Sequence, residues 1–132
     1  MTTEQAILII LYMIEKVVLQ PLEYAHLAVD VASDGFGADI LLLDVSDLSA
    51  FTDYFVILTG ESSRQLDHLA EEIEHALERS GAIRHHREGT PQTGWMLLDF
   101  GDVVVHLFAP EFREFYNLEE VWSRAPELIR IL

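Results

Sequence analysis

The chain has 132 residues, the size of one domain that can bury a core of its own. It contains no cysteine, which excludes disulfides, thiolate metal sites and cysteine nucleophiles and is typical of a reducing compartment, so we expect a cytoplasmic protein. The formal charge of −15, from 23 acidic and 8 basic residues, argues against a nucleic-acid surface and favours a basic partner, general solubility or adaptation to salt.

The N-terminal residues 6–19 are strongly apolar and predict a helix. The uninterrupted apolar run stops at Ile14, which is too short to span a bilayer, and the start of the chain lacks the positive charge of a secretory signal. Thr2 and Gln5 predict a capping box, and Pro21 ends this helix or begins the next. A helix that is apolar on nearly all sides should be buried, either against its own domain or in a subunit contact.

Helix and strand patterns then alternate, which indicates an α/β domain. Residues 22–34 carry apolar side chains at helical spacing, whereas residues 40–45 and 54–58 are short apolar runs typical of strands buried on both faces. A long helix begins at Ser62 with a capping box to Gln65. Its apolar stripe consists of Leu66, Leu69, Ala70, Ile73 and Leu77.

Two local patterns suggest ligand sites, and both signals are weak. The turn from Gly60 to Ser63 precedes a helix N-terminus, where phosphate binds, but no Walker-type lysine follows and Glu61 adds negative charge, so helix capping is the favoured interpretation. Neighbouring His85 and His86 suggest a metal, but adjacent side chains point apart and no third ligand stands at a typical spacing. We therefore expect no metal site.

The most informative stretch is a pair of apolar runs, residues 95–100 and 103–108, separated by Gly101-Asp102. A glycine in the first position of a two-residue loop predicts a type II′ hairpin, and this loop fixes a register in which Trp95 lies opposite Phe108. One face of the hairpin is wholly apolar and is predicted to be core. It carries Met96, Leu98, Phe100, Val103, Val105 and Leu107.

The second face of the hairpin mixes aromatic, acidic and imidazole groups. In one interpretation a helix covers it, with His106 and Asp99 satisfied by each other or by backbone groups; in the other it is a partly exposed recognition face. Loop residues 89–94 place Glu88 beside the Trp95 end. Residues 110–116 and 118–124 then predict two short helical turns, in which Val121 and Trp122 pack, before Pro126 breaks the pattern.

Six ordered segments together resemble the ribosomal silencing factors, also called the Iojap family. The resemblance covers about residues 22–123, so we expect an apolar helix over residues 1–20 outside the match and a single family domain over residues 21–132. The segments are Y-A-H-L-A-V-D from Tyr24, D-I-L-L-L-D-V-S from Asp39, T-D-Y-F-V-I-L-T-G-E-S-S-R-Q from Thr52, R-E-G from Arg87, G-W-M-L-L-D-F-G-D-V-V-V-H-L-F from Gly94 and R-E-F-Y-N-L-E-E-V-W from Arg113.

The resemblance implies a homodimeric non-enzyme without cofactors, which binds the fourteenth protein of the large ribosomal subunit and hinders joining of the small subunit. It also implies an α/β fold, with a mixed β-sheet sandwiched by helices and a topology similar to nucleotidyltransferases. No membrane and no nucleic-acid sequence is expected as a partner. The matching segments place the partner-binding surface on Glu88, Trp95, Asp99, His106, Arg113 and Tyr116.

The rival hypothesis is a nucleotidyltransferase-like enzyme acting on a nucleotide. That chemistry needs carboxylates converging on Mg²⁺, typically two at alternate positions of one strand. The pairs Asp99/Asp102 and Asp44/Asp47 are each three residues apart and run into a turn or loop, so neither has that geometry. Similarity of fold alone does not carry function, and the enzyme remains the alternative.

Overall fold

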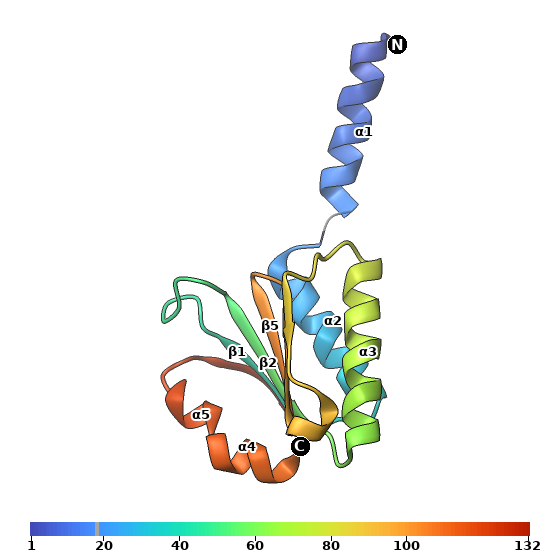
Figure 1. Cartoon of the computed structure of the whole chain (residues 1–132). Helices are drawn as coiled ribbons and strands as arrows, with labels where there is room; N and C mark the ends of the chain where they lie inside the picture. The colour runs from blue at the N-terminus through green and yellow to red at the C-terminus, as the bar shows by residue number, and fades with distance from the viewer. Residues whose placement is uncertain (18) are drawn as a thin grey trace.

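A computed structural model shows one mixed sheet with helices on both faces (Figure 1). The structure describes the backbone of residues 1–17 and 19–132 and the side chains of residues 1–14 and 19–132. The elements in chain order are α1 (Thr3–Val17), α2 (Pro21–Asp34), β1 (Ala38–Asp44), β2 (Tyr54–Thr59), α3 (Ser63–Arg79), β3 (His86–Glu88), the 3-10 turn η1 (Pro91–Thr93), β4 (Trp95–Asp99), β5 (Val103–Phe108), α4 (Pro110–Tyr116), α5 (Leu118–Val121) and β6 (Glu127–Ile131).

The six strands lie in the order β3-β4-β5-β2-β1-β6. Among the described strands only β2 and β5 pair in parallel, and α3 lies in the connection between them, because a parallel pair requires a crossover. The other neighbours are antiparallel. The predicted α/β fold with a mixed sheet between helices is therefore confirmed, whereas the likeness to nucleotidyltransferases stays a prediction.

The hairpin of β4 and β5 has the predicted register. Trp95 lies opposite Phe108 and Asp99 opposite Val104, and the amide of Phe100 donates to the Val103 carbonyl oxygen at 2.9 Å. Gly101 has a φ of +85°, which the first loop residue of a type II′ turn needs and which residues with a Cβ rarely adopt.

The main core lies between the sheet and the pair α2 and α3. The predicted α3 stripe is fully buried there, and the Ser62 hydroxyl caps α3 by accepting from the Gln65 amide at 3.1 Å. The wholly apolar hairpin face packs against these two helices, as predicted, with Phe100 partly buried at its edge. Its buried members are Met96, Leu98, Val103, Val105 and Leu107.

A second, smaller core covers the opposite face of the sheet beneath α4 and α5. Phe108 and Phe55 lie in this cluster, and the Phe55 and Trp122 rings meet edge to face with centroids 4.9 Å apart. Trp122 packs as predicted, but the prediction for Val121 was wrong because its side chain is 73% exposed. The described helix α5 also ends at Val121, three residues before the predicted end.

The expectation that the N-terminal helix is buried in its own domain was wrong. Helix α1 forms, and the predicted capping box between Thr2 and Gln5 is present, with hydrogen bonds of 2.8 and 3.1 Å. The helix extends away from the sheet (Figure 1), and Ile7–Ile14 are all exposed, so these residues belong to neither hydrophobic core of the described chain. The predicted range 6–19 includes Val18, which lies outside the described residues.

Two strands were missed at the edges of the sheet. β3 has three residues within the basic segment before the hairpin, and β6 follows Pro126, where the sequence predicted only a break. β3 pairs with β4 and thereby sets Glu88 directly opposite Leu97. This pairing builds the site described next.

Candidate functional site

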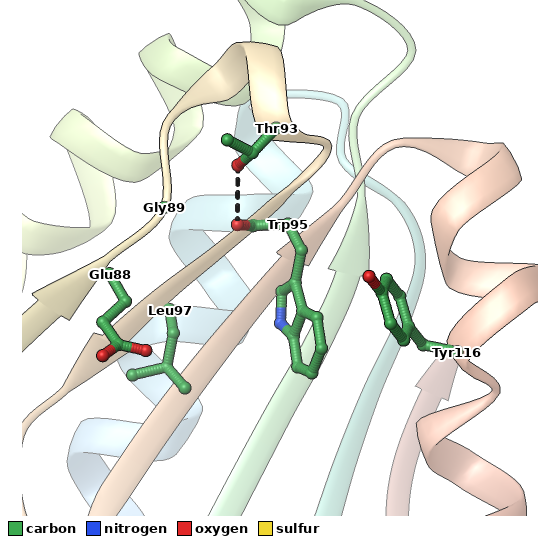
Figure 2. Close-up of a pocket in the computed structure, with 6 residues that line it drawn as sticks. All are labelled: Glu88, Gly89, Thr93, Trp95, Leu97 and Tyr116. Atoms are coloured by element: carbon green, nitrogen blue, oxygen red, sulfur yellow. Dashed lines mark hydrogen bonds between the residues drawn. The ribbon is translucent and has the colours of Figure 1, made fainter.

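A depression of about 350 Å³ lies at the edge of the sheet face that α4 and α5 cover (Figure 2). Figure 2 shows Glu88 and Leu97 on one side of the Trp95 indole and Tyr116, from the end of α4, on the other. The Thr93 hydroxyl donates to the Trp95 carbonyl oxygen at 3.2 Å and fixes the rim. The depression thus combines an apolar floor with one carboxylate. It is lined by Glu88, Gly89, Thr93, Trp95, Leu97 and Tyr116.

Aromatic packing sets the position of Trp95. Its ring stacks on Phe108 with centroids 4.9 Å apart and contacts the Tyr116 ring at 4.8 Å. Phe112 approaches from α4 so closely that a Cβ at Gly94, where φ is +77°, would lie 2.1 Å from its ring. Gly94 is therefore required for α4 to close against the end of the hairpin, and α4 in turn brings Tyr116 to Trp95.

His106 lies beneath Trp95 and does not reach the surface. It is only 4% exposed, and its Nδ1 accepts a hydrogen bond of 3.2 Å from Trp95 Nε1. Burial lowers the pKa of His106 to about 3, so the imidazole is neutral at physiological pH with its proton on Nε2. Among the described residues that Nε2 has no hydrogen-bond partner. The histidine therefore orients the indole and does not offer charge to a partner.

Asp99 lies at the other end of β4, about 13 Å from Trp95 along the strand. Its Oδ1 accepts from the Gly101 amide at 2.7 Å, which supports the hairpin turn. Asp99 and His106 do not satisfy each other: one is bound by backbone and the other by Trp95. Helices bury the β5 side chains of this face, as the first alternative predicted, while Trp95, Leu97 and Asp99 on β4 stay half-buried. That this face recognises a partner stays a prediction.

Arg113 points inward from α4 and is 8% exposed. It belongs to a ring of alternating charges with Asp39, Arg130 and Glu119. Arg113 Nε donates to Glu119 at 2.8 Å and its Nη2 lies 3.4 Å from Asp39, while Arg130 binds Asp39 at 3.1 Å and Glu119 at 3.0 Å. Arg113 also donates to the Thr59 hydroxyl at 2.9 Å.

The ring of Arg113, Asp39, Arg130 and Glu119 joins α4 and α5 to β1 and β6. Burial alone would raise the pKa of Glu119, but hydrogen bonds and charge from Arg113 and Arg130 outweigh it and hold that pKa below its usual range. Asp39 adopts a φ of +43°, a conformation uncommon for a residue with a side chain, beside an irregularity in β1. The ring therefore anchors α4, and with it Tyr116, to the sheet.

The six predicted site residues thus fall into three groups. Glu88, Trp95 and Tyr116 meet at the depression; His106 and Arg113 support it from inside; Asp99 lies apart at the turn. Sequence reasoning did not single out Leu97 or Thr93 as site residues, although the alternation of β4 placed Leu97 on the same face as Trp95. Phe115, 77% exposed and packed against Tyr116 with centroids 5.1 Å apart, extends the aromatic surface.

The described residues show no cluster of three or more side chains suited to a metal ion. His86 Nε2 lies 2.9 Å from Glu88 Oε1, which is a contact between two side chains and not a cluster of three within the described part of the chain. At the turn before α3, Gln65 accepts from the Glu61 amide at 2.7 Å and Ser62 accepts from the Gln65 amide, which supports capping rather than anion binding.

None of the described helices has the length and apolar character needed to cross a membrane.

Residues 19–131 match the family described as ribosomal silencing factor during starvation. The chain is 39% identical over 100 residues to ribosomal silencing factor RsfS of Bacillus subtilis (strain 168), across 76% of this chain and 85% of that protein. It is 38% identical over 104 residues to the chloroplastic protein Iojap of Zea mays, across 79% of this chain and 45% of that protein. A crystal structure of a protein from Chromobacterium violaceum superposes with a TM-score of 0.77 at 34% identity, covering 80% of this chain and 88% of the other.

Proposed function

Because the chain belongs to the ribosomal silencing factor family, we propose that it binds the large ribosomal subunit through that subunit's fourteenth protein, blocks joining of the small subunit and thereby represses translation. The observation that carries the proposal is the family match across residues 19–131, which includes every residue of the depression. Relatives in the match are named silencing factors and not enzymes. The proposal extends this to the present chain as a non-enzyme that acts in the cytoplasm as a homodimer.

The depression suits a basic side chain of the partner. A cation placed over the faces of Trp95 and Tyr116 gains from the aromatic rings, and the Glu88 carboxylate at the rim pairs with its charge. The formal charge of −15 adds long-range attraction for a basic protein. In this proposal Trp95, Tyr116, Leu97 and Glu88 contact the partner directly.

The remaining predicted site residues act by positioning in this proposal. His106 orients the Trp95 indole through the 3.2 Å hydrogen bond, and Arg113 fixes α4 so that Tyr116 meets Trp95. Asp99 shapes the turn at the far end of the hairpin. Loss of any of these three side chains should affect binding only through displacement of the contacting residues.

Sedimentation with separated ribosomal subunits tests the proposed function. We expect the protein to migrate with the large subunit and not with the small one, and we expect preloaded large subunits to join small subunits more slowly in a light-scattering assay. Val121→Ala, at an exposed residue outside the depression, serves as a matched control that retains both effects. Migration with neither subunit, or with the small subunit, would contradict the proposal.

A further inference from the structure

Helix α1 exposes an apolar surface that the rest of the described chain does not cover. Large apolar side chains follow one another from Ile7 to Ile14 and are 45–65% exposed; all but Tyr12 are aliphatic or methionine. Monomeric proteins rarely leave so large a continuous apolar surface in water. The aliphatic residues are Ile7, Leu8, Ile9, Ile10, Leu11, Met13 and Ile14.

Helix α1 contributes to neither the family match nor the described hydrophobic cores. The family match begins at residue 19, and among the described residues neither hydrophobic core contains a side chain of α1. With about half of each of these seven side chains exposed, the helix offers on the order of 600 Å² of apolar surface, the upper end of what a typical monomer exposes in one patch. That area approaches the share of about 800 Å² that each partner contributes to a standard protein interface.

A lipid surface is a poor match for this helix. Helices that lie in a membrane interface carry a polar face rich in lysine and arginine, whereas Glu4 is the one charged residue among the described side chains of α1. The net charge of −15 also opposes approach to anionic lipids. A groove that covers one side of the helix would still leave its other sides in water, because apolar side chains surround the axis.

The spacing of the isoleucines favours copies of the same helix. Ile7, Ile10 and Ile14 are separated by three and then four residues, the a-d-a spacing of a heptad. We call the line of these three isoleucines the seam, and Leu11 and Met13 flank it. Isoleucine at both a and d positions favours bundles of three or four helices over pairs, and such a bundle covers several sides of each helix.

We propose that α1 is a self-association helix that joins copies of this chain through a bundle of α1 helices. This interface lies outside residues 19–131, which match the family, and it is separate from the depression. It joins the homodimers of the proposed function into a larger assembly. Figure 1 shows α1 projecting from the end of the molecule opposite α4. Because Tyr116 ends α4 and contacts Trp95, the bundle leaves both residues accessible on every copy. A linked set of copies presents several binding sites together, which raises the effective concentration at a ribosome once one copy is bound.

Sedimentation equilibrium of the full chain tests the proposal, with two matched sets of variants. Ile10→Glu/Ile14→Glu places charges in the seam, while Ile83→Glu makes the same change at an isoleucine of the domain that is 74% exposed. We expect the seam variant to raise the dissociation constant of the assembly at least tenfold and the Ile83 variant to leave it unchanged. Both should retain their circular dichroism spectrum and their migration with the large subunit, which separates this proposal from the proposed function.

A single introduced thiol gives an independent readout, because the chain contains no cysteine. Under mild oxidation Ile10→Cys should form a disulfide-linked pair of chains, and Ile83→Cys should not at the same concentration. A monomeric wild-type protein at 100 micromolar, or an assembly with the same mass in the seam variant, would overturn the proposal. So would flotation of wild-type protein, but not of the seam variant, with phosphatidylcholine vesicles, since it would assign α1 to lipid.

Discussion

The two faces of the β4–β5 hairpin are built from alternate residues of the same strands, but they differ in composition and in how helices cover them. One face carries only apolar side chains and is covered by the long helices α2 and α3. The other carries Trp95, His106 and Phe108 and is covered in part by the short helices α4 and α5. The first face has no polar group to satisfy, whereas the second retains a half-buried indole, a buried imidazole and a depression.

The difference shows how one rigid element serves both stability and recognition. Packing against α2 and α3 holds the strands, so the residues that alternate with the core are presented from a fixed frame. Helices α4 and α5 cover the second face only in part, and the residues that they leave uncovered are the ones that contact solvent. If this division is correct, changes on the first face should act on folding, and changes on the second should act on binding.

Substitution of the neighbouring leucines Leu97 and Leu98 in β4 should give the largest difference in the free energy of unfolding. Leu98 is fully buried on the first face, and Leu98→Ala should lower the free energy of unfolding by about 3 to 5 kcal/mol through lost burial and a cavity. Leu97→Ala, on the half-buried second face, should cost about 1 kcal/mol. Urea denaturation measures both. Equal losses for the two variants would break the division between the faces.

Arg113 and Arg130 test whether the charged ring supports the second face. Arg113→Met removes the buried member and leaves Glu119 and the Thr59 hydroxyl without it, so we expect a loss of about 3 kcal/mol in unfolding free energy and weaker binding to the large subunit. Arg130→Met, at a more exposed member of the same ring, should cost less than about 1 kcal/mol. A direct contact role for Arg113 would instead weaken binding with no loss of stability.

The sequence predicted the elements whose signals are local. A two-residue loop with glycine first fixes the hairpin register, and the stripe from Leu66 to Leu77 repeats at helical spacing with a cap at Ser62. Edge strands lack such signals: β3 has three largely exposed residues, and β6 mixes charged and apolar residues without regular alternation and is mostly exposed. Their pairing is decided by the strands beside them and not by their own composition.

The contacts that complete the site depend on distant parts of the chain. Arg113 meets Asp39 across 74 positions, and Arg130 meets it across 91, which no local pattern encodes. The sequence did place Asp99 and His106 on one face, but Asp99 binds the adjacent turn and leaves His106 to Trp95. In α1 the residues specify an apolar helix without specifying what covers it.

Substitution of Trp95 tests how much the second face contributes to binding of the large subunit. Trp95→Ala should weaken binding to the large subunit by about 2 kcal/mol, chiefly through faster dissociation, because a large aromatic anchor is lost. Trp95→Phe retains a stacking ring but loses the hydrogen bond to His106, so we expect a smaller loss. Surface plasmon resonance gives both rates, after circular dichroism and thermal melting show that the variants fold. Unchanged affinity and dissociation rate would move the interface away from this face.

His106 makes the stability of the second face depend on pH. Its pKa is about 3 in the folded chain and about 6.5 in the unfolded chain, so below pH 6.5 the unfolded chain binds a proton that the folded chain does not. Stability should therefore fall as pH falls, by about 2 kcal/mol from this group between pH 7 and pH 5. The same urea titration of His106→Gln, which cannot titrate there, provides the reference. Identical pH dependence in the two proteins would place a solvated histidine at this position.

Glu88 gives the smallest expected effect, because its carboxylate lies at an exposed rim. An exposed charge contributes mainly long-range attraction, which speeds association and weakens as salt screens it, whereas desolvated aromatic contacts set the dissociation rate. Glu88→Gln should therefore cost less than about 1 kcal/mol in binding, mostly as slower association, and its difference from wild type should shrink from 50 mM to 500 mM salt. Glu120→Gln removes an equal charge from α5, outside the depression, and is the matched control. If Glu88 instead pairs with a buried cation of the partner, the variant will dissociate faster and the difference will persist at high salt, which would place the edge of the desolvated contact at β3 and not at Trp95.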